Sequence, residues 1–146
     1  MSEPPPTEAT ALDSTWIANN PVPVHASGTT KNSRGRVLAI GGSRTVPGAL
    51  RLTGEAALRA GAGKLQMATI ASAAPMLGLL VPEAGVIALD EDDEGEIGET
   101  AAERLKEPME TCNALVIGPG MSGVEAARRL LCTVLAHHRD DLVMLP

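Results

Sequence analysis

Short apolar runs alternate with longer amphipathic stretches along the chain from residue 36 onward. Residues 37–40 form an uninterrupted apolar run that ends in two glycines, a pattern typical of a strand buried on both faces. Four later runs share this character, and stretches with helical spacing separate them. The predicted strands cover 37–40, 65–70, 85–89, 114–117 and 142–145, and the predicted helices cover about 48–60, 72–80, 99–110 and 123–138.

This alternation predicts an α/β fold with three layers, in which helices cover both faces of a mostly parallel sheet. The folded domain is expected to cover residues 35–146. Residues 1–34 are instead rich in Pro, Thr, Ser and Asn and show no sustained period, which predicts a flexible N-terminal leader. Within it, Trp16 and Ile17 are the candidate anchor to the domain.

Composition narrows the function classes. The 146 residues carry a net charge of −6 and only 1% aromatic residues, so the chain lacks both the positive charge and the stacking rings of a nucleic-acid binder. It has no basic amphipathic stretch and no apolar run near 20 residues, which argues against a membrane partner. The first ten residues do not resemble a signal peptide, and a cytoplasmic protein is expected. Cys112 and Cys132 are expected to be reduced structural thiols.

Two glycine turns follow predicted strands, at Gly41–Gly42 and at Gly118–Gly120. The second spells G-x-G-x-x-G with Gly123, the letters of a Rossmann dinucleotide site. That site also needs an acid at the end of the next strand, whereas the acids here precede it, so the Rossmann interpretation is disfavoured. Because carboxyl ends of parallel strands share one edge, both turns are expected at the ligand-binding edge of the sheet.

The other candidate motifs in the sequence do not indicate a functional site. Lys64 is followed by Leu65 where a Walker loop needs Ser or Thr. The acidic segment 90–98 has Ala101 where a calcium loop needs its bidentate Glu, which favours a solvated loop. His137 and His138 suit a helix C-terminus, and His25 has no partner in the sequence. No metal site and no catalytic set of residues is predicted.

From Gly35 to Thr69 the chain reads GRVLAIGGS, then PGA, then EAALRAGAGKLQMAT, and ALVIGPGM follows later. These motifs, with Pro82–Glu83 between them, closely resemble the ADP/ATP-dependent (S)-NAD(P)H-hydrate dehydratases. The resemblance covers about residues 31–145. It implies a ribokinase-like fold, hydrated NADH or NADPH as the substrate, and ADP or ATP with Mg²⁺ as the nucleotide that drives loss of water.

Carried over by resemblance, Ala49 and Gly120 match positions that contact the hydrated cofactor. Gly42, Gly48 and Gly118 would shape the same pocket. Lys31-Asn32-Ser33 departs from the family's Lys-Gly-Asp, so no role is carried over to Asn32 or Ser33.

The family's Thr-Pro-His-Pro-Gly-Glu segment, its adenine-nucleotide loop and its Gly-x-Gly-Asp catalytic turn do not occur in the sequence. The expectation is therefore an N-terminal half of the domain, truncated after about the fifth strand, inactive alone, marginally stable and prone to self-association, a homo-oligomer included. Two alternatives stay open: another ribokinase-like small-molecule kinase, or a non-catalytic nucleotide-binding or interaction module.

Overall fold

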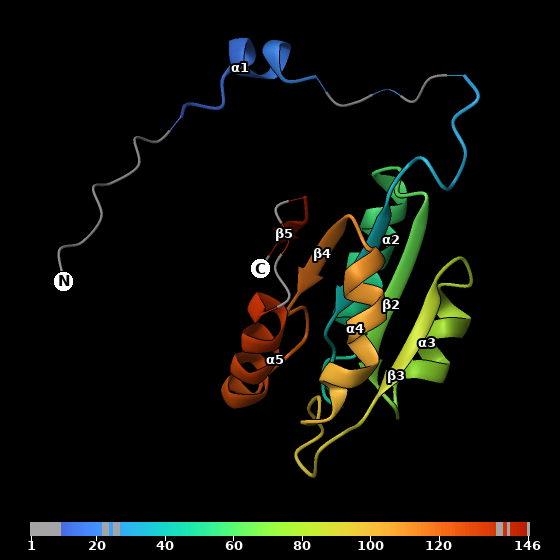
Figure 1. Ribbon diagram of the computed structural model, residues 1–146, viewed down its shortest axis with the longest axis vertical. Coiled ribbons are helices and arrows are strands. Elements are labelled where there is room, and N and C mark those ends of the chain that lie inside the picture. The colour runs from blue at the N-terminus through green and yellow to red at the C-terminus, as the bar shows by residue number, and fades with distance from the viewer. Residues whose placement is uncertain (1–9, 22–23, 25–26, 137–138, 140, 146) are drawn as a thin grey trace, which may run out of the picture.

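Five parallel strands form one sheet in the order β3-β2-β1-β4-β5 within the residues that the structure describes (Figure 1). The computed structural model describes residues 10–21, 24, 27–136, 139 and 141–145. The strands are β1 (Arg36–Ile40), β2 (Lys64–Ile70), β3 (Gly85–Leu89), β4 (Ala114–Ile117) and β5 (Val143–Leu145). The helices are α1 (Ser14–Asn19), α2 (Gly48–Arg59), α3 (Ala74–Leu80), α4 (Ala101–Thr111) and α5 (Val124–Ala136).

Helices cover both faces of this sheet, which confirms the predicted three layers. Central strand β1 shows why, because Leu38, Ala39 and Ile40 are all fully buried and alternate between the two faces. Ala39 packs into the core under α2 and α3, whereas Leu38 and Ile40 pack into the larger core under α4 and α5. The larger core also takes Leu105 from α4, Leu115 from β4, and Leu130 and Val134 from α5.

Within the domain the observed elements follow the predicted ones to within two residues, whereas helix α1 in the leader was not predicted. Helix α3 begins at Ala74 rather than at residue 72, because Pro75 occupies its first turn, where a missing N–H costs no hydrogen bond. Helix α4 begins at Ala101 rather than at residue 99. The predicted extension of the last helix over His137 and His138 lies outside the described residues.

Close packing between α2 and β2 depends on a glycine in the middle of the helix. A Cβ atom at Gly54 would lie 2.5 Å from the sulfur of Met67 and 3.1 Å from Leu65 Cδ2. A helical glycine costs about 1 kcal/mol relative to alanine, so its presence here indicates that the short helix–sheet distance outweighs this cost. The middle of α2 thus lies directly against β2.

The leader contributes no buried residue to the domain among its described positions in α1. Asp13 caps this helix by accepting a hydrogen bond from the Trp16 N–H at 2.8 Å, but the helix stands apart from the sheet (Figure 1). Trp16 is 40% exposed and Ile17 is 61% exposed. The predicted anchoring role of these two side chains is therefore wrong, because neither reaches an apolar surface.

Strand β5 is the shortest strand and lies at one edge of the sheet. It pairs with β4 through Val143 and Leu145, yet these two side chains remain 59% and 52% exposed. Leu135 on the neighbouring helix α5 is also exposed. An exposed apolar edge strand is a template for pairing with a second chain.

We expect Val143→Lys to reduce self-association of the chain, because a lysine on an edge strand opposes pairing with another strand. The measurement is the associated fraction in sedimentation velocity over a range of chain concentrations. Leu52→Lys is the matched control, since Leu52 is an exposed apolar residue on α2, away from this edge. Equal association of the unmodified chain and Val143→Lys would contradict the role of the β5 edge.

Candidate functional site

The two glycine turns lie where the order of the sheet reverses. The chain proceeds from β1 through β2 to β3 in one direction and then returns to place β4 on the other side of β1. The first two crossovers therefore cover one face of the sheet, and the next two cover the other. In parallel α/β sheets, ligands bind outside the carboxyl ends of the two strands at this reversal point. Here those strands are β1 and β4.

The two turns are in direct backbone contact. The Gly42 N–H donates a hydrogen bond of 2.7 Å to the carbonyl oxygen of Pro119. The same carbonyl is the closest atom to the position that a Cβ at Gly41 would occupy. Any side chain at Gly41 would therefore push the turns apart. Contact between the two turns is a finding of the structure, while the ligand they bind stays a prediction.

Gly42 and Gly120 both need glycine for two independent reasons. Their φ angles are +81° and +75°, a region that other residues rarely adopt. A Cβ at Gly42 would also lie 2.6 Å from Thr69 Oγ1, and a Cβ at Gly120 would lie 3.0 Å from Ala49 Cβ. Of the predicted site residues, the structure thus brings Gly42, Ala49 and Gly120 together.

The other two predicted residues lie at the margin of this contact. A Cβ at Gly48 or at Gly118 would meet no atom within 4 Å, so both face open space. Gly48 lines a neighbouring cavity of about 420 Å³ between the start of α2 and helix α3, whose walls include Pro47, Met76 and Leu80. This cavity is mostly apolar, unlike the polar groups around the turns.

Three hydroxyl groups that the sequence analysis did not single out lie beside the turns. Ser43 is 1% exposed, and its Oγ accepts a hydrogen bond from the Val46 N–H at 3.3 Å. The same oxygen lies 3.2 Å from Thr45 Oγ1 and 3.4 Å from Ser122 Oγ. Ser43 therefore connects the first glycine turn to the residue that follows the second. Its position in the sequence directly after Gly42 could have identified Ser43 as a residue of the site.

The acidic loop (residues 90–98) is not the solvated loop that the sequence predicts. Glu96 is 5% exposed and Ile97 is 2% exposed. Asp92 Oδ1 accepts hydrogen bonds from the N–H groups of Glu94 at 3.1 Å and Glu96 at 2.9 Å, which folds the loop back on itself. A bridge between Glu91 and Ile97 closes it. Ile97, an apolar residue within the acidic run, is the sign of this burial in the sequence.

This loop is attached to both glycine turns. The Arg44 N–H, directly after the first turn, donates a hydrogen bond of 2.9 Å to the Gly95 carbonyl. The Ser122 N–H, after the second turn, donates a hydrogen bond of 3.1 Å to Glu96 Oε1. The second turn thus supplies a donor to one buried oxygen of Glu96, and Glu96 in return holds the turn. This matters because a buried carboxylate oxygen without a donor lowers the stability of the fold.

No group of three or more His, Cys, Asp or Glu residues in the described part of the chain is arranged to hold a metal ion. The three histidines lie outside the described residues. Cys112 and Cys132 are both free, and burial raises the pKa of the Cys112 thiol. No helix over the described ranges has the length and apolar character needed to cross a bilayer.

Comparison with known proteins identifies the family. A sequence model described as NAD(P)H-hydrate dehydratase matches residues 37–144. The ADP-dependent (S)-NAD(P)H-hydrate dehydratase of Xanthomonas campestris pv. campestris is 53% identical over 111 residues, which cover 75% of this chain and 37% of that protein. The bifunctional NAD(P)H-hydrate repair enzyme Nnr of Thermofilum pendens is 35% identical over 128 residues, covering 86% of this chain and 24% of that protein.

The chain belongs to the NAD(P)H-hydrate dehydratase family. The resemblance found in the sequence is therefore confirmed. The chain spans 37% or less of the length of these two curated relatives.

Solved structures confirm the ribokinase-like fold expected of an NAD(P)H-hydrate dehydratase. A ribokinase-like superfamily protein from Enterococcus faecalis V583 superposes with a TM-score of 0.74 at 27% identity, over 90% of this chain and 43% of that chain. The ADP/ATP-dependent NAD(P)H-hydrate dehydratase of Bacillus subtilis, co-crystallised with ATP and Mg²⁺, gives a TM-score of 0.62 at 26% identity, over 84% of this chain and 40% of that chain.

In this family member, the acidic loop carries a pH-sensitive contact. A hydrogen bond from the Ser72 side chain, assisted by the Arg44 guanidinium, lowers the pKa of Glu91 below its ordinary value of 4.5. Arg44 Nε lies 2.8 Å from Glu91 Oε1. Because the pKa is lower in the folded state, the contact stabilises the fold fully above the ordinary pKa and ceases to do so as the pH falls through the folded value.

We therefore expect Glu91→Gln to lower the stability of the chain near pH 7, with a difference from the unmodified chain that shrinks as the pH falls below 4.5. Urea midpoints measured from pH 3 to pH 7 test this. Glu94→Gln serves as the control, since it removes a carboxylate from the same loop without touching Arg44. A difference that stays constant over this pH range would rule out the contact as its source.

Proposed function

We propose that the chain supplies the hydrated-cofactor-binding edge of an ADP/ATP-dependent (S)-NAD(P)H-hydrate dehydratase, an enzyme that converts (S)-NAD(P)H hydrate to NAD(P)H. The observation that carries this proposal is the direct contact of the two glycine turns at the reversal point of the sheet, with Ala49 beside them. Membership of the NAD(P)H-hydrate dehydratase family supports the choice of substrate. The site residues proposed are Gly42, Gly48, Ala49, Gly118 and Gly120.

The start of α2 offers the groups that such a substrate needs. A hydrated dinucleotide carries a negatively charged pyrophosphate. No side chain caps the N-terminus of α2, so the N–H groups of its first turn are free for a ligand. Together with the positive end of the helix dipole, they favour an anion at this point. Ala49 is small enough to let the ligand reach them.

The glycines supply close approach rather than charge. With no side chains at Gly118 and Gly120, a ligand can lie against the backbone after β4 while its phosphates face the start of α2. The exposed Ser122 hydroxyl lies next to this path and is suited to a hydroxyl group of a ribose, while buried Ser43 holds it from behind. In this arrangement the chain binds and orients the substrate.

The adenine nucleotide and Mg²⁺ are not assigned to these residues. The described part of the chain presents no set of three metal-ligating side chains, and the sequence lacks the family's nucleotide loop and catalytic turn. In the proposed enzyme, bound ADP or ATP would supply the phosphoryl group whose transfer makes the substrate hydroxyl a leaving group. The proposal includes a cytoplasmic location, in keeping with metabolite repair, and no nucleic-acid or membrane partner, in keeping with the net charge of −6.

We expect Ala49→Glu to weaken binding of hydrated NADPH by about 100-fold or more, because the new side chain fills the approach to α2 and repels the pyrophosphate. Isothermal titration of the chain with hydrated NADPH measures the effect. Ala56→Glu is the matched control, since Ala56 lies on the exposed side of the same helix.

Unchanged affinity of Ala49→Glu would refute the site. Loss of affinity in both variants would indicate a general effect of charge or of helix stability. If the chain bound the substrate of a ribokinase-like small-molecule kinase more tightly than hydrated NADPH in the same titration, the alternative ribokinase-like function would be favoured.

A further inference from the structure

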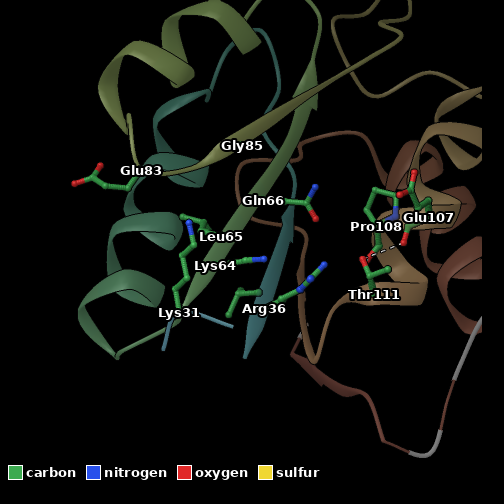
Figure 2. Close-up of a pocket in the computed structure, with 12 residues that line it drawn as sticks. Lys31, Arg36, Lys64, Leu65, Gln66, Glu83, Gly85, Glu107, Pro108 and Thr111 are labelled. Atoms are coloured by element: carbon green, nitrogen blue, oxygen red, sulfur yellow. Dashed lines mark hydrogen bonds between the residues drawn. The ribbon is translucent and has the colours of Figure 1, made fainter. Parts of the chain in front are cut away.

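The opposite, amino edge of the sheet contains another cavity, of about 450 Å³, which is lined mainly by polar groups (Figure 2). The proposed function does not use it. Its walls come from the start of β1 and β2, the last turns of α4 and the segment before β1. The polar side chains that line it are Lys31, Arg36, Lys64, Gln66, Glu83, Glu107 and Thr111.

The cavity exists because polar residues replace core residues at this end of the strands. Arg36 and Gln66 lie on the same face of the sheet as buried Leu38 and Ala68, the face that α4 covers. Gln66 pairs with Gly85, which has no side chain to fill the corner. A hollow with charged walls thus remains between the sheet and the end of α4.

Two positive charges face each other directly across the strands in this hollow. Arg36 and Lys64 are register partners in the parallel pair of β1 and β2, and both are half-buried. Like charges directly opposite each other destabilise a sheet. No carboxylate among the described residues lies within 4.0 Å of either group. Figure 2 shows both side chains directed to the same side as Gln66, toward Pro108 on α4.

The surrounding charges leave this corner positive. The carbonyl of Lys31 lies against Gly63, just before β2, and Lys31 is a third cation among the lining residues, with its side chain beside Leu65 in Figure 2. Glu83 also lines the cavity, but its carboxylate is directed away from it (Figure 2). Glu107 is the carboxylate on the α4 wall. Three cations against two carboxylates is a local excess of positive charge in a chain whose net charge is −6.

We propose that this cavity binds the phosphate group of a small phosphorylated metabolite. The Arg36 guanidinium suits two parallel hydrogen bonds to phosphate oxygens, Lys64 supplies a point charge beside it, and the Gln66 amide adds a neutral donor. An anion between Arg36 and Lys64 relieves their mutual repulsion. The volume exceeds that of a bare phosphate and lies in the range of small-molecule sites. Arg36 is five residues before Gly41, so the site lies roughly 17 Å from the glycine turns along β1, and it is independent of the proposed function.

The test is titration of the chain with inorganic phosphate at constant ionic strength, with chloride as the balancing anion, followed by calorimetry and amide chemical shifts. We expect saturable binding, with shifts at the start of β1 and β2. Arg36→Gln and Lys64→Gln should each weaken it about tenfold or more. Lys106→Gln removes the same charge from an exposed position on α4 outside the cavity and should leave affinity unchanged, as should Ala49→Glu.

A second measurement separates binding from a structural role. Without phosphate, Lys64→Gln should melt at the same temperature as the unmodified chain or higher, because it removes the cross-strand repulsion. A lower melting temperature would show that Lys64 supports the fold instead, and would overturn the proposal. Absence of saturable binding, or equal weakening by Lys106→Gln, would also overturn it. Loss of binding in Ala49→Glu but not in Lys64→Gln would place the phosphate at the glycine turns.

Discussion

One backbone hydrogen bond, from the Gly42 N–H to the Pro119 carbonyl, determines how the carboxyl edge of this protein is arranged. It can form only because β1 and β4 are neighbours and their ends lie level, with Ile40 paired to Ile117. It also requires that no side chain stand between the turns, which glycine at positions 41 and 42 satisfies. The contact sets the spacing of the two turns, beside which the start of α2 and Ser122 lie.

The charge of the chain would oppose an anionic ligand if its acids faced the site, and the acidic loop shows how this is avoided. Asp92 accepts two backbone N–H groups within the loop, Glu96 accepts one from Ser122, and Glu91 pairs with Arg44. These three carboxylates each face at least one donor, although the second oxygen of Glu96 is buried without a partner, and the donors reduce the field that the loop exerts on its surroundings. A segment that looks like a repulsive run of charge therefore acts as a brace for the two turns.

The fold followed from the sequence because each strand is an apolar run and each helix has a regular apolar face. The pairing of β4 with β1 was not encoded in any local pattern, since strand order depends on how all the crossovers pack together. Burial of Glu96 was missed for the same reason, because its partner, the Ser122 N–H, is 26 residues away. Gly42 and Gly120 could be singled out because a strand that ends in glycine is a local signal. That Gly48 also lines the neighbouring cavity could not be foreseen, since the space around a turn depends on the helix beyond it.

The two edges of the sheet present positive potential by different means, and this difference bears on what each can select. At the carboxyl edge the donors are backbone N–H groups. The fold fixes their positions, and they carry no net charge. Such a site discriminates by shape, because it depends on close approach to glycine and Ala49. At the amino edge the donors are side chains of Arg36 and Lys64, held together against their own repulsion. A site of that kind responds to the charge of its ligand first and to its shape second. The hydrated dinucleotide of the proposed function must be distinguished from its undamaged form and needs the first kind of recognition, whereas the phosphate group proposed for the amino edge is well served by the second.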